Sequence, residues 1–201
     1  MRVIAGIHRG RPLVAPPGLA TRPILDRVKV ALFDWLGARL AMPGQLPALH
    51  VLDLYSGAGS LGIEAVSRGA ASVTFVERDP AALQCLRENL QALKINGATV
   101  VPTAAETLLA RPPQPNSAYG LIFVDPPYPL SEKVEAGAPI VRVFERLGDQ
   151  VPIEADSTLV WRHDIRFSAP PRMAGRWHAH EARSYGTMTI TLYRPFAVEG
   201  A

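Results

Sequence analysis

The sequence predicts an α/β protein with a mostly parallel, seven-stranded sheet, helices on both faces, and a small amino-terminal β-hairpin or arm. Apolar or β-branched runs alternate with helical patterns through the middle of the chain, which is the signature of βαβ units. Four consecutive apolar residues at 121–124 are typical of a strand buried on both faces. We expect strands near 49–54, 72–77, 98–101 and 120–124, and helices near 60–68, 80–94 and 104–110.

The elements outside this core follow from local signals. Residues 2–7 and 11–15 predict the arm, and Pro16-Pro17-Gly18 predicts a linker. Helical spacing of apolar residues begins at Asp26, which we place near the helix cap. The last expected elements are a helix near 136–148 and strands near 157–162, 178–184 and 187–194, the final pair antiparallel. The chain should thus consist of an arm over residues 1–24 and one domain over 25–196.

Composition excludes several classes of protein. With 201 residues and 48% hydrophobic content, the chain can bury one substantial core. Apolar stretches are interrupted well before about 18 residues, so no membrane span is predicted, and the start lacks the apolar core of a signal peptide. We therefore expect a cytoplasmic protein. The lone Cys85 should be a packed core thiol, and the five histidines lack zinc spacing, so we expect no metal.

A glycine loop follows the first expected strand. Gly57, Gly59 and Gly62 have the spacing of a dinucleotide site, where glycines let the backbone approach a pyrophosphate at a helix N-terminus. However, Asp53 lies four residues ahead of Gly57, and an acid there would repel phosphate. It suits a ligand with a cationic end, such as S-adenosylmethionine.

Two further motifs end expected strands. Glu77 ends the run at 72–77, where a carboxylate can accept hydrogen bonds from both hydroxyls of an adenosine ribose. Asp125-Pro126-Pro127-Tyr128 follows the buried strand, at the edge where parallel sheets bind ligands. The prolines have no N–H, so rigid carbonyl acceptors can lie beside the Asp125 carboxylate. A base can stack on Tyr128, a contact worth roughly 1–3 kcal/mol. Acceptors and a stacking ring together suit an aromatic amine.

These motifs together resemble the class I S-adenosylmethionine-dependent methyltransferases, which have a Rossmann-like fold, and among them those that methylate exocyclic amines of bases. Segments at both ends resemble the RsmD family, whose members methylate N2 of one guanine in small-subunit (16S) ribosomal RNA. The segments are Arg2-Val3-Ile4-Ala5-Gly6, Arg9-Gly10-Arg11, Arg22-Pro23, Asp26-Arg27-Val28, Ala31-Leu32-Phe33 and Ser184-Tyr185-Gly186. The likeness covers essentially the whole chain.

The resemblance implies direct in-line transfer of the sulfonium methyl group to guanine N2. The implied S-adenosylmethionine-binding residues are Asp53, Tyr55, Ser56, Gly57, Gly59, Glu77, Arg78, Ala105 and Asp125. The implied catalytic residues are Asp125, Pro126, Pro127 and Tyr128, with the amine donating to the Asp125 carboxylate and the Pro126 carbonyl. A base inside a helix could not reach this loop, so the target should be a loop, bulge or flipped nucleotide of 16S ribosomal RNA or of the assembling small subunit.

Charge is distributed unevenly along the chain. Residues 1–39 have a net charge of +5, residues 40–160 a net charge of −5, and residues 161–186 a net charge of +3. Six of the seven basic residues in the first segment are arginine, whose planar fork suits phosphate and base edges. We therefore expect the arm to face RNA, and the expected RNA-binding residues are Arg9, Arg11, Arg22 and Arg27.

Some positions differ from the family pattern and leave alternatives open. Ile24, Val30 and Ala104 stand where the family has polar residues, which would also fit a catalytically silent RNA-binding relative. Arg162 stands near a position where relatives often have Glu, and Thr187 where Asp is common. The Asp-Pro-Pro-Tyr motif alone would also suit adenine N6 or cytosine N4 as the target. A nicotinamide oxidoreductase would use the glycine loop but would leave that motif without a role.

Overall fold

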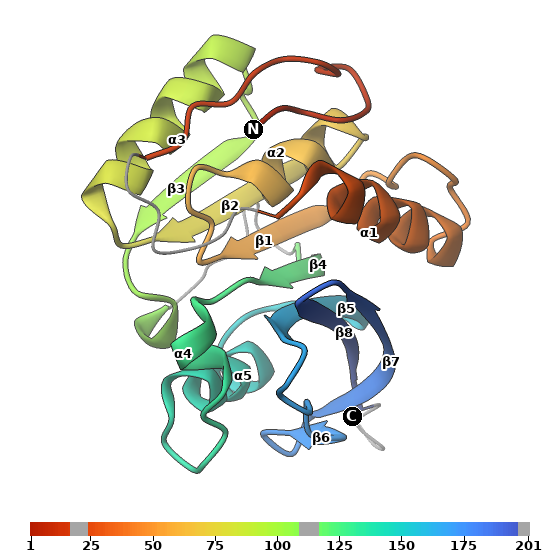
Figure 1. Ribbon diagram of the computed structural model, residues 1–201, viewed down its shortest axis with the longest axis vertical. Coiled ribbons are helices and arrows are strands. Elements are labelled where there is room, and N and C mark those ends of the chain that lie inside the picture. The colour runs from red at the N-terminus through yellow and green to blue at the C-terminus, as the bar shows by residue number, and fades with distance from the viewer. Residues whose placement is uncertain (17–23, 109–116, 197–201) are drawn as a thin grey trace.

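The computed structural model describes residues 1–16, 24–108 and 117–196 and contains one mixed sheet (Figure 1). Its strands are β1 (His50–Leu54), β2 (Ser72–Glu77), β3 (Ala98–Pro102), β4 (Tyr119–Val124), β5 (Ile153–Asp164), β6 (Arg172–Met173), β7 (Trp177–Tyr185) and β8 (Met188–Pro195). Their order is β3-β2-β1-β4-β5-β8-β7-β6. The five strands β1 to β5 are parallel to one another, whereas β8, β7 and β6 pair antiparallel.

The α/β fold and all seven expected strands are confirmed. The eighth strand, β6, has only two residues and pairs with the start of β7. A two-residue strand is too short to show a pattern of alternation in the sequence, so it was not expected.

The helices are α1 (Asp26–Arg39), α2 (Ser60–Ser67), α3 (Pro80–Leu93), α4 (Tyr128–Ser131), α5 (Pro139–Asp149) and the 3-10 helix η1 (Ala105–Thr107). Asp79 caps α3 by accepting a hydrogen bond from the Ala82 N–H at 2.8 Å, with Pro80 in the first turn. The helix expected at 104–110 is the short η1, and 109–110 lie outside the described residues. Asp26 begins α1 but does not cap it, and pairs instead with Arg2 at 2.9 Å.

The sheet separates two apolar cores, because successive side chains of a buried strand point to opposite faces. Val51 of β1 packs with α1, α2, α3 and the amino-terminal arm, whereas Leu52 and Leu54 pack with η1 and α5 on the other face. Figure 1 shows this arrangement of helices on both faces. Within the described part of the chain, no helix combines the length and apolar character needed to cross a membrane.

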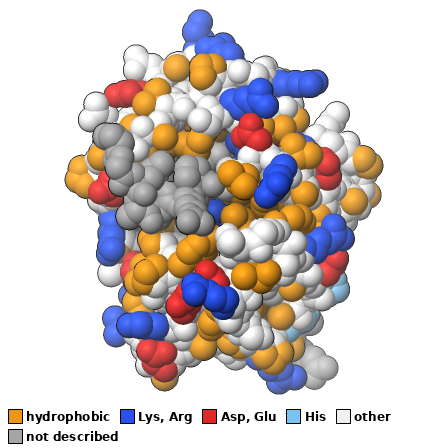
Figure 2. Space-filling model, in the orientation of Figure 1, with side chains coloured by type: hydrophobic (Ala, Val, Ile, Leu, Met, Phe, Trp, Pro, Cys, Tyr) orange, Lys and Arg blue, Asp and Glu red, His pale blue; other side chains and the backbone are white. Residues whose placement is uncertain are grey.

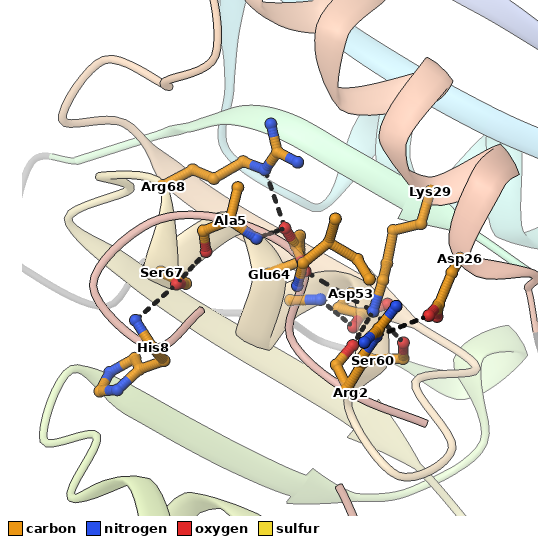
Figure 3. Close-up of polar contacts among 12 residues, drawn as sticks. Arg2, Ala5, His8, Asp26, Lys29, Asp53, Ser60, Glu64, Ser67 and Arg68 are labelled. Atoms are coloured by element: carbon orange, nitrogen blue, oxygen red, sulfur yellow. Dashed lines mark hydrogen bonds and ion pairs between the residues drawn. The ribbon is translucent and has the colours of Figure 1, made fainter. Parts of the chain in front are cut away.

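The amino-terminal arm, residues 1–16, is a docked loop rather than a regular hairpin. Its two sides meet in one isolated bridge between Arg2 and Pro12. The buried Glu64 carboxylate of α2 accepts hydrogen bonds from the Ile4 and Ala5 N–H groups at 2.8 and 2.9 Å (Figure 3). Gly6 has a φ of +79°, and a Cβ there would lie 1.7 Å from the Ser67 carbonyl oxygen, so only glycine permits this close approach.

Candidate active site

A cavity of about 540 Å³ opens at the carboxyl ends of the parallel strands, where α/β sheets bind their ligands. Of the residues predicted to form the site, nine line it: Asp53, Tyr55, Ser56, Gly57, Glu77, Arg78, Ala105, Asp125 and Pro127. Met1, Pro16 and Ile24 also line the cavity, so the arm and the start of α1 complete one wall. None of these three apolar residues was predicted as a site residue: the sequence context of Met1 and Pro16 carries no ligand-binding signal, and Ile24 was noted only as a departure from the family pattern.

The glycines of the loop have different local roles. Gly57 has a φ of +54° and lines the cavity, and a Cβ there would have no atom within 4 Å. Gly59 does not line the cavity, and a Cβ there would lie 2.5 Å from Leu86 Cδ1. The Gly62 N–H donates to Asp53 Oδ2 at 2.9 Å. Gly57 therefore leaves space beside the cavity, whereas Gly59 and Gly62 allow α2 to pack tightly.

Asp53 lies at the base of the cavity with only 1% of its surface exposed. Burial raises the pKa of its carboxyl group to about 8, the Asp125 and Glu77 carboxylates act in the same direction, and the hydrogen bond from Gly62 opposes them. A cationic group bound beside Asp53 would favour its ionised form. The residue is therefore suited to the cationic end of a ligand.

Glu77 lies at the rim, where three backbone N–H groups orient its carboxylate. Gly57 donates to Oε2, while Arg78 and Asp79 donate to Oε1, each at 2.8 Å. Because a carboxylate offers about four lone-pair positions, this arrangement leaves room for about one further hydrogen bond. Glu77 is thus better placed to accept from one ribose hydroxyl than from two.

Asp125 follows β4 and forms an ion pair with Arg162 of β5, which also lines the cavity. The pairing of Val124 with Trp161 in the parallel register brings the next residue of each strand side by side. Burial raises the pKa of Asp125, and the Arg162 guanidinium opposes that shift. The sequence analysis named Arg162 as a departure from the family pattern and did not predict it as a site residue. The signal that could have identified it is its position at the end of the strand expected near 157–162.

The rest of the Asp-Pro-Pro-Tyr motif lies around this ion pair. Pro127 lines the cavity, whereas Pro126 is buried and does not line it. Tyr128 begins α4 outside the cavity lining, half-buried, with its ring centre 5.9 Å from the Arg162 guanidinium carbon. The cavity therefore brings Asp125 and Pro127 together, while the stacking role of Tyr128 stays a prediction.

The donor set of the cavity fits a polar, nucleoside-like ligand. Tyr55 Oη and Ser56 Oγ are buried and have no hydrogen-bond partner among the described residues. Both residues line the cavity beside Gly57. A bound ligand with hydroxyl, amino or carboxyl groups would supply the missing partners. Within residues 1–16, 24–108 and 117–196, no three His, Cys, Asp or Glu side chains are grouped as metal ligands.

The arginines predicted to bind RNA are only partly described. Arg9 and Arg11 are exposed on the arm, Arg27 is exposed on α1, and Arg22 lies outside the described residues. A Cβ at Gly186 would lie 4.0 Å from Arg27 Nη2, so the basic segments from the two ends of the chain meet here. On the face shown in Figure 2, basic side chains are interspersed with acidic and hydrophobic ones.

Lys29 is the one lysine among the seven basic residues counted in segment 1–39, and it is buried. It is 1% exposed, and its Nζ lies 3.6 Å from Glu64 Oε2 and donates to the Arg2 carbonyl at 2.7 Å (Figure 3). Burial lowers the pKa of the Lys29 ammonium, and Glu64 opposes that shift. This positive charge therefore holds the arm and does not face RNA.

Comparisons with known proteins agree with this geometry. The family model described as Conserved hypothetical protein 95 matches residues 1–194. The chain is 34% identical over 194 residues to ribosomal RNA small subunit methyltransferase D of Escherichia coli strain K12, a match that covers 96% of this chain and 89% of the relative. It is 33% identical over 195 residues to the Bacillus subtilis protein YlbH, covering 96% and 98% of the two chains.

Solved structures extend the likeness to the fold. The Escherichia coli protein yhhF superposes with a TM-score of 0.76 at 31% identity, and the match covers 97% of each chain. A protein of Thermus thermophilus has a TM-score of 0.73 at 29% identity, covering 96% of this chain and 98% of its own. The chain therefore belongs to the RsmD family of class I, S-adenosylmethionine-dependent methyltransferases, and it has their Rossmann-like fold.

Proposed function

We propose that this protein transfers a methyl group from S-adenosylmethionine to the exocyclic N2 amine of a guanine in small-subunit (16S) ribosomal RNA. The observation that carries the proposal is that the Asp125 carboxylate shares one cavity with Asp53, Gly57 and Glu77. An acceptor for an amine thus lies beside the groups suited to the cofactor. The relative from Escherichia coli is named as a methyltransferase of small-subunit ribosomal RNA, which supports the substrate class.

The chain offers a distinct group to each part of the cofactor. S-adenosylmethionine, when bound, supplies a methyl group on a sulfonium centre. Glu77 would accept from a ribose hydroxyl, and Asp53 would face the cationic amino-acid end. Ser56 Oγ and Tyr55 Oη have no partner within the described residues and would gain one from the ligand. The open space at Gly57 would let the ligand approach the backbone.

The chemistry requires mostly placement of the amine. The N2 lone pair is delocalised into the guanine ring, so the nitrogen is a poor nucleophile until its N–H groups are held by acceptors. Asp125, with the Pro126 carbonyl as a second predicted acceptor, would hold the amine while Tyr128 stacks the base. As the new N–CH₃ bond forms and the S–CH₃ bond breaks, the nitrogen becomes acidic. Its proton then passes to Asp125 or water, so no separate general base is required.

The RNA would approach from the arm, which we propose as an RNA-facing part over residues 1–24 attached to a catalytic domain over residues 25–196. Arg9 and Arg11 are exposed on it, and Arg27 lies beside the turn at Gly186. Phosphate contacts from these arginines would place the flipped guanine over the Asp125 loop. Such a substrate, ribosomal RNA or the assembling small subunit, fits a protein of the cytoplasm.

The test is methyl transfer to RNA that lacks the modification. Small subunits and naked 16S RNA from a strain deleted for the gene are incubated with the purified protein and methyl-labelled S-adenosylmethionine. Nuclease digestion and mass spectrometry should find N2-methylguanosine at one position, formed about 10²–10³-fold or more slowly with Asp125→Ala. Methylated adenine or cytosine would move the target to another base. Binding of RNA with no transfer to either substrate would favour the catalytically silent alternative.

A further inference from the structure

Arg162 occupies a place in the cavity that the proposed reaction does not yet use. Its Nε donates a hydrogen bond to Asp125 Oδ1, and the two side chains are only 8% and 17% exposed. The pair is held by the register of β4 and β5, in which Val124 is opposite Trp161. Arg162 therefore touches the residue that is assigned to the target amine.

The surroundings of Asp125 are rich in negative charge. The other carboxylates that line the cavity belong to Asp53 on β1, Glu77 on β2 and Asp79 beyond it. Two described cations line it, Arg78 and Arg162, and of these Arg162 forms the ion pair with Asp125. The neighbouring rings are those of Tyr55, which follows β1, and Tyr128 in α4. Without Arg162, Asp125 would be a poorly solvated carboxylate among other acids.

We propose that Arg162 is a positioning residue that keeps the Asp125 carboxylate ionised and oriented toward the target amine. Its Nε donates to Oδ1, which fixes the orientation of the carboxylate. One oxygen is thus anchored, and the carboxylate, which has about four lone-pair positions, can still accept an incoming N–H. This inference rests on the proposed methyl transfer only for the identity of the amine.

The physical reason lies in the protonation state of the acid. Burial raises the pKa of Asp125, and the Arg162 guanidinium counteracts this effect. A protonated carboxyl group would present an O–H donor to the amine in place of one acceptor. An arginine suits the task because its own charge is not lost at any working pH. Loss of Arg162 should therefore make methyl transfer depend on pH where the parent protein does not.

The kinetic test compares Arg162→Gln and Arg162→Lys with the parent across pH 6 to 9.5, at saturating S-adenosylmethionine. We expect Arg162→Gln to lower kcat at pH 7 by at least tenfold. The decrease of kcat on the acidic side should occur at higher pH than in the parent, and the activity should recover near pH 9. Arg162→Lys should restore most of the activity at pH 7. Arg166→Gln is the matched control, since Arg166 follows β5 with an 82% exposed side chain and should leave the profile unchanged. A lower kcat with a parallel profile, or a faster Arg162→Gln enzyme, would overturn the proposal.

A second measurement is independent of the RNA target. Carboxyl groups of aspartate are labelled with carbon-13 and titrated by NMR in the parent and in Arg162→Gln, with Asp125→Asn used to assign the signal. The Asp125 signal should titrate at higher pH in Arg162→Gln. An unmoved titration would refute the role of Arg162 even if the parent methylates guanine. A moved titration in a protein that methylates no RNA would instead refute only the proposed function.

Discussion

Arg162 Nε donates a hydrogen bond to Asp125 Oδ1, joining two residues that are 37 positions apart, one just after β4 and the other in the neighbouring parallel strand β5. The contact places the positive charge of Arg162 beside the Asp125 carboxylate, the group of the Asp-Pro-Pro-Tyr motif that is proposed to bind the substrate amine. It also distinguishes Asp125 from Asp53, the other acid of the cavity that is proposed to have a different role. Asp125 has a cationic partner, whereas Asp53 has the Gly62 N–H.

Replacing Asp125 by alanine should lower methyl transfer by about 10²–10³-fold or more, because a group that hydrogen-bonds the reacting centre is lost. The affinity for S-adenosylmethionine should change by no more than a few fold, as measured by calorimetry. Glu132→Ala, which removes an exposed acid just after α4, is the control and should retain activity. Equal loss of binding and transfer in Asp125→Ala would assign the carboxylate to the cofactor instead.

The stability of the folded chain should fall as pH rises from about 4 to about 8, because of Asp53. Burial raises the pKa of this residue from 3.8 in an ordinary environment to about 8. In this window the unfolded chain releases the proton while the folded chain keeps it, so the free energy of unfolding decreases with pH and levels off above about 8. An asparagine at position 53 stays neutral, so Asp53→Asn should remove this decrease. The decrease amounts to about 1.4 kcal/mol for each unit by which the pKa of Asp53 is higher in the folded chain than in the unfolded chain.

Urea unfolding of the Asp53→Asn variant and its parent at pH 5 and pH 8 measures this effect. The variant should gain stability relative to the parent mainly at pH 8, while it binds S-adenosylmethionine more weakly. Parallel unfolding behaviour at both pH values would show that Asp53 is ionised in the folded protein over the whole range.

Glu64→Gln should destabilise the protein and release the arm. The Glu64 carboxylate is fully buried, accepts from two arm N–H groups, and pairs with Lys29 at 3.6 Å and Arg68 at 2.9 Å. Removing its charge leaves the buried Lys29 without its ion-pair partner and leaves the buried Arg68 with only the exposed Asp34. We expect a loss of about 3–5 kcal/mol, which corresponds to a fall in Tm of roughly 6–20 °C.

The matched control for Glu64→Gln is Asp34→Asn. Asp34 also faces Arg68, at 3.8 Å, but its side chain is 62% exposed. Because Asp34 is exposed to solvent, we expect this pair to contribute only about 0–1 kcal/mol. Limited proteolysis should cut residues 1–16 faster in Glu64→Gln than in Asp34→Asn. Equal Tm values for the two variants would mean that the Glu64 network does not hold the arm.

Neutralising Arg9 and Arg11 together should flatten the salt dependence of RNA binding. Each phosphate contact that is lost reduces the log-log slope by about 0.7–0.9, so the double variant should change it by up to about 1.4–1.8. The Michaelis constant for RNA should rise, and affinity for S-adenosylmethionine should not change. Arg142→Ala removes an exposed arginine from α5, on the other face of the sheet, and serves as the control. Identical slopes for all proteins would place the RNA face elsewhere.

The parts of the site that depend on local chemistry could be read from the sequence. The strand before Asp125, the glycine loop after Asp53 and the capped helix after Glu77 are each set by residues within about a dozen positions. Apolar runs, positive-φ glycines and an Asp-Pro cap determine their conformation locally. Because the carboxyl ends of parallel strands share one edge of the sheet, these motifs could be expected in one site before any contact was known.

Other features were decided only by contacts across the fold. Lys29 contributes to the net charge of +5 counted for residues 1–39, but packing of α1 on α2 buries it against Glu64. Met1 carries no sequence signal of binding and reaches the cavity because the arm is docked on α2, while Ile24 lines the cavity from its position just before α1. Arg162 acquires its place from the register of β4 against β5. The sequence by itself thus determined the strands, the motifs and the edge at which they meet, because those depend on neighbouring residues. The tertiary structure decided which charges are paired, since pairing depends on which distant side chains share the same small volume.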